Sequence, residues 1–219
     1  MIHYSRAQHA ARALLGDVTE AVIVTDQYAG YHYIPQSQRQ FCWAHILRNV
    51  GAIADSWGPN KPIGQRLETL IHLIFRTRHR FERGELTPYL YQKRMGKIRK
   101  RWQATLEHAT EACVTPRYRN RCALLLKHDE SCWTFLTDKD IPLTNNEAER
   151  SLRSYVLWRK GSYGVYSHRG EQYRQRILTI VESCRKLGAN PLDWLRQIVH
   201  AVITRSEYPA LPELTALSQ

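Results

Sequence analysis

The sequence lacks the features that mark a membrane or secreted protein. None of its apolar runs approaches the roughly 20 residues that a membrane-spanning helix needs. The opening stretch MIHYSRAQHA has no apolar segment of the kind found in signal peptides. We therefore expect a cytoplasmic protein without membrane association.

Cysteine is sparse, and its spacing is irregular. The five cysteines are scattered along the chain, and no two of them stand in a CxxC spacing. This pattern predicts free, mostly buried thiols and excludes a disulfide scaffold. Cys42 and His45 form a CxxH pair that could supply half of a zinc site, but no matching second pair is visible, so a structural role for these two residues is favoured.

Acidic residues are also scarce, and the formal net charge is +12. Residues 61–101 hold twelve Lys and Arg residues against three acidic ones. Such a charge favours an anionic polymer as partner, because contacts with phosphate release counterions. Nucleic acid is the leading partner class, and Lys97, Arg99, Lys100 and Arg101 are candidate phosphate contacts. A solvated basic surface is the alternative interpretation of these four residues.

The first fifty residues alternate between strand and helix patterns. Residues 1–4, 20–26 and 39–43 are typical of short strands, and residues 5–16 and 44–55 of amphipathic helices. This alternation predicts an α/β fold over residues 1–50.

The next part of the chain changes character. Residues 64–81 have helical apolar spacing, a second helix begins at Thr87 and Pro88, and residues 118–136 are expected to form a third. Residues 51–143 are therefore predicted to be a basic, all-α insertion.

The last part is predicted to be helical as well. A helix should begin at Asn146, as its cap, and run to about Trp158, before a glycine-, serine- and arginine-rich loop over 159–170. Two more helices complete the segment 144–208, and 209–219 is expected to be a loose tail.

Two carboxylates stand at positions where they could bind a ligand or a metal ion. Asp26 ends a buried strand, where α/β proteins place ligands. Glu149 falls in the first turn of a helix, where a carboxylate favours the helix dipole. Each also has a structural interpretation, Asp26 as the start of a turn and Glu149 as a capping acid. Together with the basic segment and the 159–170 loop, they suggest carboxylates that hold Mg²⁺ beside a nucleic-acid backbone.

Five motifs together resemble one protein family. They are TDQYAGY (25–31), CWAHILR (42–48), TNNEAERSLR (144–153), RKGSYGVYSHRG (159–170) and SCRKLGANPLDWL (183–195). Their order and spacing resemble the transposases of the insertion sequence 66 family, which are DDE enzymes with a ribonuclease H-like core. The resemblance implies an incomplete core of this kind, with about three strands and flanking helices, interrupted by the all-α insertion.

The resemblance also implies the catalytic residues. Asp26 matches the second catalytic carboxylate and Glu149 the third, whereas Glu147 falls at a variable position of the motif. The implied cofactor is Mg²⁺, with Mn²⁺ as a substitute, because hard cations prefer oxygen ligands. In such enzymes two divalent ions about 4 Å apart assist the displacement at phosphorus.

Further residues are implied to contact DNA. They are Asn146, Arg150, Arg153, Arg159 and Lys160. Arginine and lysine would offset the charge that builds up on the phosphoryl oxygens. His45 either contacts DNA or packs at the start of its helix beneath Trp43.

The chain departs from the family pattern in one respect. The first catalytic Asp of the family lies well before the TDQYAGY motif, yet only 25 residues precede Asp26. Asp17 is the only Asp among them and follows a helix-stopping glycine, which makes it a poor substitute. We expect a C-terminal portion of such a transposase, from a truncated or split gene, with weak or absent strand transfer on its own.

The expected function is Mg²⁺-dependent strand cleavage and transfer of an insertion element by a nucleoid-associated transposase. Its partners would be the element ends and target DNA, with self-association or a full-length transposase in addition. The alternatives are a non-catalytic DNA-binding or subunit-binding remnant that modulates a full-length transposase, and a two-metal nuclease unrelated to transposition.

Overall fold

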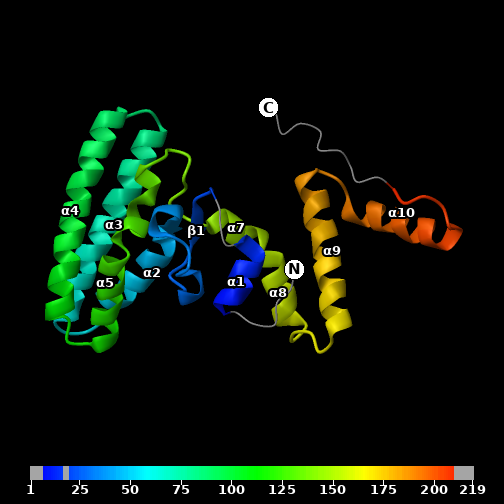
Figure 1. The fold of residues 1–219 in the computed structure, drawn as a ribbon, viewed down its shortest axis with the longest axis horizontal. Helices are drawn as coiled ribbons and strands as arrows, with labels where there is room; N and C mark the ends of the chain where they lie inside the picture. The colour runs from blue at the N-terminus through cyan, green and yellow to red at the C-terminus, as the bar shows by residue number, and fades with distance from the viewer. Residues whose placement is uncertain (1–6, 17–19, 210–219) are drawn as a thin grey trace. The chain divides into compact units, whose positions relative to one another are not determined.

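A computed structural model describes residues 7–16 and 20–209. The chain divides into two compact units, which we call the N-terminal unit (Ser5–Glu147) and the C-terminal unit (which includes Ala148–Gln219). The described residues are mostly helical, with one two-stranded parallel sheet (Figure 1).

The sheet lies near the start of the N-terminal unit. The elements of this region are α1 (Gln8–Leu15), β1 (Ile23–Thr25), the 3-10 turns η1 (Ala29–Tyr31) and η2 (Gln36–Gln38), and β2 (Arg39–Phe41). Strands β1 and β2 run parallel, with Ile23 opposite Arg39 and Thr25 opposite Phe41. The two predicted strands over 20–26 and 39–43 are thus confirmed, although each is only three residues long. The strand predicted over 1–4 lies outside the described residues.

Helices form the rest of the N-terminal unit. They are α2 (Trp43–Ala54), α3 (Asn60–Glu82), α4 (Pro88–Ala112), α5 (Pro116–Lys127), the short α6 (Asp129–Trp133) and the 3-10 turn η3 (Thr134–Leu136). The start of α4 is confirmed, because the Thr87 hydroxyl accepts the Leu90 N–H at 3.3 Å.

The single helix predicted over 118–136 is wrong, because the chain breaks at His128. His128 leaves the helical conformation at φ −112° and ψ 35°, and its ring packs against His32 and Phe41. After the break, the Phe135 N–H donates to Gln40 Oε1 at 2.7 Å. Tertiary contacts here override a continuous helical pattern.

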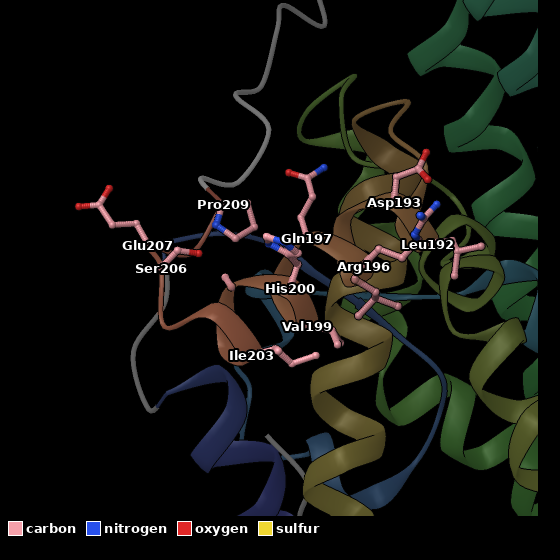
Figure 2. Close-up of a pocket in the computed structure, with 12 residues that line it drawn as sticks. Leu192, Asp193, Arg196, Gln197, Val199, His200, Ile203, Ser206, Glu207 and Pro209 are labelled. Carbon is pink, nitrogen blue, oxygen red and sulfur yellow. The ribbon is translucent and has the colours of Figure 1, made fainter.

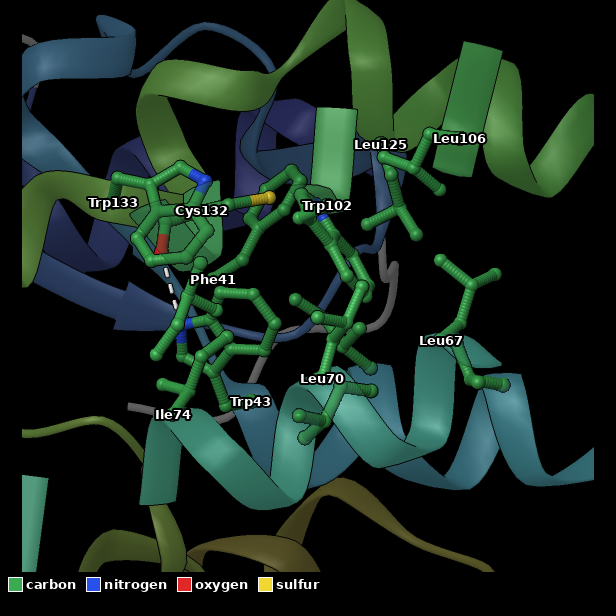
Figure 3. Close-up of a cluster of buried hydrophobic side chains, with 14 of the residues drawn as sticks. Phe41, Trp43, Leu67, Leu70, Ile74, Trp102, Leu106, Leu125, Cys132 and Trp133 are labelled. Carbon is green, nitrogen blue, oxygen red and sulfur yellow. Dashed lines mark hydrogen bonds between the residues drawn. The ribbon is translucent and has the colours of Figure 1, made fainter. Parts of the chain in front are cut away.

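The core of the N-terminal unit is centred on tryptophan (Figure 3). Trp43 is fully buried, with its ring edge-on to Trp102 at 5.2 Å and to Trp133 at 5.3 Å. Its Nε1 donates to the Cys132 carbonyl at 2.9 Å. Aliphatic side chains of α3 and α4 surround these rings. The predicted thiol state is confirmed, because all five cysteines are free and buried.

Glycine permits the close packing of two core helices. A Cβ added at Gly64 of α3 would lie 2.2 Å from the Ala54 backbone nitrogen of α2. Only glycine therefore allows α3 to pack this closely on the end of α2.

The C-terminal unit is built from helices over its described residues. They are α7 (Asn146–Ser151, which begins two residues before the unit), α8 (Arg153–Gly161), α9 (His168–Lys186) and α10 (Pro191–Thr204). The cap predicted at the Asn190–Pro191 pair is confirmed, since Asn190 Oδ1 accepts the Leu192 N–H at 3.0 Å.

Two boundaries in the C-terminal unit differ from prediction. The helix expected from Asn146 to Trp158 is interrupted at Leu152 and then continues to Gly161. The loop expected over 159–170 is shorter and covers 162–167, because Ser167 Oγ accepts the Gly170 N–H at 3.1 Å and caps α9.

The structure supports the α/β prediction only at a coarse level, as a small parallel sheet in a mostly helical chain. Within the described ranges, no helix is both long and apolar enough to cross a bilayer.

Candidate metal and nucleic-acid site

Asp26 lies directly after strand β1 and is half-buried. One of its carboxylate oxygens, Oδ1, accepts the Tyr28 N–H at 3.0 Å, so the side chain starts the turn that leads into η1. This is the structural role that the sequence also allowed. A carboxylate has two oxygens and about four acceptor positions, so the turn leaves capacity for a hard cation.

A buried arginine holds this turn in place. Arg39 is 1% exposed; its Nε donates to Thr25 Oγ1 at 2.8 Å, and its Nη2 donates to the carbonyls of Asp26 at 3.0 Å and Tyr28 at 3.3 Å. Burial lowers the pKa of Arg39 to about 10, an effect that the charge of Asp26 opposes, so the guanidinium remains cationic at neutral pH. Sequence analysis missed this residue, although an arginine inside the short apolar strand RQFCW was a signal for it.

Polar side chains of α2 and α5 extend the network beyond Asp26. Asn49 Nδ2 donates to Gln27 Oε1 at 2.7 Å, and Arg121 Nη1 donates to the Asn49 carbonyl at 3.1 Å. Gln27 Nε2 is buried and has no hydrogen-bond partner among the described residues. A buried amide donor next to Asp26 suits a site that receives a phosphate oxygen or a metal-bound water.

Glu149 lies on α7 and is exposed. Its backbone carbonyl accepts the Leu152 N–H at 3.2 Å, at the point where α7 gives way to α8. Asp26 belongs to the N-terminal unit and Glu149 to the C-terminal unit, so their joint coordination of a metal stays a prediction. Over the described ranges, no group of three or more His, Cys, Asp and Glu side chains is gathered as a metal site.

The predicted DNA-contacting cations of the C-terminal unit are all exposed. Arg150 is in the last turn of α7, Arg153 begins α8, and Arg159 and Lys160 are in the last turn of α8. Their side chains are therefore accessible to a phosphate backbone. Asn146 is exposed too, but it is the first residue of α7, which corrects its prediction as the cap.

His45 lies in the first turn of α2 and is half-buried. Its backbone N–H donates to the Cys42 carbonyl at 3.1 Å, and the fully buried Trp43 is two residues before it. This placement fits the packing role, and its DNA contact stays a prediction.

Four of the twelve basic residues in 61–101 are paired with acids. The pairs are Arg78–Glu82, Arg80–Glu85, Arg83–Glu85 and Arg99–Asp129. Arg78 is 6% exposed and also donates to the Lys139 and Ile141 carbonyls, so it has a structural role. Arg99 Nε donates to Asp129 Oδ2 at 3.0 Å, which sets it apart from the other cations of KIRKR.

The other eight basic residues of this segment are exposed, and five of them lie on α4. We call these five the α4 basic stripe: Lys93, Arg94, Lys97, Lys100 and Arg101. Lys93, Lys97 and Lys100 follow one another at spacings of four and three, so they share one helix face. The core residues of α4, such as Met95 and Trp102, lie on the opposite side. The stripe can therefore follow a nucleic-acid backbone without disturbing the core.

A broad hollow of about 1160 Å³ lies along α10 (Figure 2). Its lining includes the apolar Leu192, Val199 and Ile203 and the polar Arg196 and His200. No candidate catalytic or DNA-contacting residue lines it, so this hollow is separate from the predicted site.

Comparisons with known proteins agree with the motifs. The sequence model of a family described as "Transposase IS66 family" matches residues 1–173. The chain is 37% identical over 75 residues to uncharacterized protein y4hP of Sinorhizobium fredii, a match that covers 34% of this chain and 14% of that protein. It is 35% identical over 72 residues to uncharacterized protein y4qI of the same organism, covering 33% of this chain and 13% of that protein. The matches therefore cover only a small part of these relatives. No solved structure matches the chain.

Proposed function

The chain belongs to the IS66 family of transposases, and from this membership we propose that it acts in DDE-type DNA transposition. The reaction would be Mg²⁺-dependent cleavage and transfer of the DNA strands of an insertion element. Strands β1 and β2 would form part of a ribonuclease H-like core.

The position of Asp26 is the observation that carries this proposal. Asp26 follows a parallel strand, in a turn fixed by the buried Arg39, and it is the Asp of the TDQYAGY motif. Ligands of open α/β sheets bind at the carboxyl ends of strands. An acid held there by an internal network is preorganised for binding a cation.

The residues present fit the proposed metal. Asp26 and Glu149 offer carboxylate oxygens, which Mg²⁺ prefers, and neither is enclosed by apolar side chains to the exclusion of solvent. When bound, the metal would supply activation of the attacking oxygen and neutralisation of the leaving one.

Cations of this chain would stabilise charge on the DNA. Arg150 and Arg153 follow Glu149 closely in the sequence and would contact phosphate oxygens near the reacting centre. The α4 basic stripe would hold flanking backbone, where its role is affinity and not sequence recognition.

A second candidate function is DNA binding without catalysis. The observation in its favour is the α4 basic stripe, because it lies in a unit with its own core and can bind phosphate without either carboxylate. The stripe would then serve to occupy DNA or to accompany a full-length transposase.

A strand-cleavage assay separates the two functions. The chain is incubated with DNA that carries the ends of its insertion element, with Mg²⁺ or with EDTA. Catalysis predicts Mg²⁺-dependent nicking that Asp26→Asn and Glu149→Gln each abolish, whereas Glu147→Gln, at a neighbouring acid, leaves it in place. End-labelled DNA makes a low yield of nicked product detectable.

Binding without cleavage would support the second function. If the chain binds this DNA but gives no Mg²⁺-dependent product, the non-catalytic function is supported and the catalytic one fails. In that case, replacing Lys97 and Lys100 by alanine should make binding less sensitive to salt. The slope of log K against log salt concentration should decrease in magnitude by roughly 0.9 for each phosphate that the variant no longer neutralises.

A further inference from the structure

The loop between α8 and α9 carries two aromatic rings that are exposed to solvent (the two helices are labelled in Figure 1). It covers residues 162–167, with the sequence SYGVYS. Tyr163 is 87% exposed and Tyr166 is 92% exposed. The loop thus presents two aromatic rings to solvent within six residues, and each ring has a large flat face on which another ring can stack.

Tyr163 also has an unusual backbone conformation. Its φ is +53°, in the left-handed region, and the Gly164 N–H that follows donates to the Arg159 carbonyl at 3.1 Å. This pattern ends α8 in a Schellman-type turn, in which the left-handed residue is usually glycine. A tyrosine at this position is strained, and such strain is concentrated at functional sites.

A buried arginine fixes the first half of the loop. Arg174 of α9 is 5% exposed, and its Nη2 donates to Ser162 Oγ at 2.8 Å and to the Gly164 carbonyl at 3.0 Å. Its guanidinium lies over the Trp158 ring, 4.9 Å from the centroid. The strained tyrosine is therefore flanked by two residues that Arg174 holds in place.

The second half of the loop is also fixed. A Cβ added at Gly170 would lie 2.6 Å from Val165 Cγ1, so Val165 packs closely against the start of α9. Ser167 caps that helix through its bond to the Gly170 N–H. Val165 thus packs inward, while Tyr163 and Tyr166 on either side of it are exposed.

Basic residues flank the loop in the sequence on both sides. Arg159 and Lys160 lie in the last turn of α8, and Arg169 lies in the first turn of α9, all of them exposed. Exposed aromatic rings beside cations are the chemistry of surfaces that bind unpaired nucleic-acid bases, where the rings stack on bases and the cations contact phosphate.

We propose that residues 162–167 form a stacking wedge, in which Tyr163 and Tyr166 bind unpaired DNA bases. The inference rests on the proposed action on DNA and adds the substrate feature that this loop would bind. Strand cleavage and transfer take place where a duplex is nicked or opened, and the wedge would hold the displaced base. Because Arg174 and Val165 hold the loop in place, little ordering would be needed on binding.

The test uses two probes that differ by one base. One is a fully paired duplex, and the other is the same duplex with a single unpaired 2-aminopurine, whose fluorescence falls when it stacks. Binding by the full chain is compared with binding by Tyr163→Gly and Tyr166→Ala. Tyr208→Ala is the matched control, because Tyr208 is a 70% exposed tyrosine outside the loop. Tyr163→Gly relieves the left-handed strain, so this variant should fold at least as well as the wild type, and its thermal midpoint is measured beside its binding.

The wild-type chain should bind the unpaired probe at least about five-fold more tightly than the paired one and quench its fluorescence. Tyr163→Gly and Tyr166→Ala should lose this preference and the quenching but keep their affinity for the paired duplex. Tyr208→Ala should behave as wild type.

Equal affinity of the wild-type chain for both probes, or a preference that survives in Tyr163→Gly, would overturn the wedge alone. If neither probe binds, the proposed action on DNA fails and the wedge fails with it. The two failures are therefore distinguishable.

Discussion

The two units of the chain are packed very differently. The N-terminal unit has a continuous core of buried aromatic and aliphatic side chains. In the described helices of the C-terminal unit, only Arg174, Cys184 and Ala201 are buried. Val199 and Ile203 of α10 are 56% and 76% exposed. Stability therefore resides mainly in the N-terminal unit, because local stability follows buried apolar contact.

The two proposed catalytic acids therefore differ in how firmly their surroundings hold them. Asp26 is fixed by a buried hydrogen-bond network within its own unit. Glu149 lies on a short helix that has no buried residue. The proposed catalytic acids thus combine one rigid partner with one whose position depends on contacts outside its own helix.

The largest expected effect follows removal of the central tryptophan. Trp43→Ala should lower the free energy of unfolding by about 3–5 kcal/mol, because it leaves a cavity between Trp102 and Trp133. Trp57→Ala is the control, since Trp57 is 94% exposed, and it should change stability by less than about 0.5 kcal/mol. Urea unfolding measures both, and equal effects would contradict the assignment of stability to this core.

The next effect concerns the turn that holds Asp26. Arg39→Met should destabilise the chain by about 1–3 kcal/mol, because it removes three hydrogen bonds of a buried guanidinium, those to Thr25 Oγ1 and to the Asp26 and Tyr28 carbonyls. Hydrogen exchange at residues 26–28 should also become faster. Arg76→Met, at an exposed arginine of α3, should change neither quantity. Unchanged exchange in Arg39→Met would show that the turn is held by other contacts.

A smaller effect is a decrease of stability in acid. Burial, the nearby His32 and the charges of Arg39 and Lys127 lower the pKa of His128 from its ordinary 6.5. At this residue the unfolded chain therefore binds more protons than the folded chain does as the pH falls below 6.5. Stability should fall as the pH drops below that value, by at most about 1.4 kcal/mol per pH unit for this one residue. His128→Phe should flatten the dependence in urea unfolding at a series of pH values, and a slope equal to wild type would contradict the assignment.

The smallest effect lies in the C-terminal unit. Tyr163→Gly should raise the free energy of unfolding by about 0.5 kcal/mol, because relief of left-handed strain outweighs the entropy cost of glycine. The thermal midpoint measures this increase. A decrease in the midpoint would show that the Tyr163 ring itself contributes to folding.

The sequence predicted those structural elements that depend on neighbouring residues in the chain. Examples are the helix caps at Thr87 and Asn190 and the two described strands. The structure has all of them at the predicted positions. The position of Asp26 directly after a strand was also predictable from the local pattern.

Features that depend on distant contacts were not predictable from local patterns. The break at His128 follows from packing against His32 and Phe41, and Arg39 acquires its role only when β2 lies beside β1. The strain at Tyr163 arises from how α8 ends against Arg174. The exposure of cations such as Arg153 was easier to predict, because charged residues are usually at the surface.

The central proposal is that the carboxylates of Asp26 and Glu149 bind the same divalent metal site. Fe²⁺ can replace Mg²⁺ and, with ascorbate and peroxide, cleaves the polypeptide backbone close to where it binds. The account predicts cuts beside both Asp26 and Glu149, and the disappearance of both cuts in Asp26→Asn and equally in Glu149→Gln. Cuts beside one residue that persist when the other is replaced would contradict it.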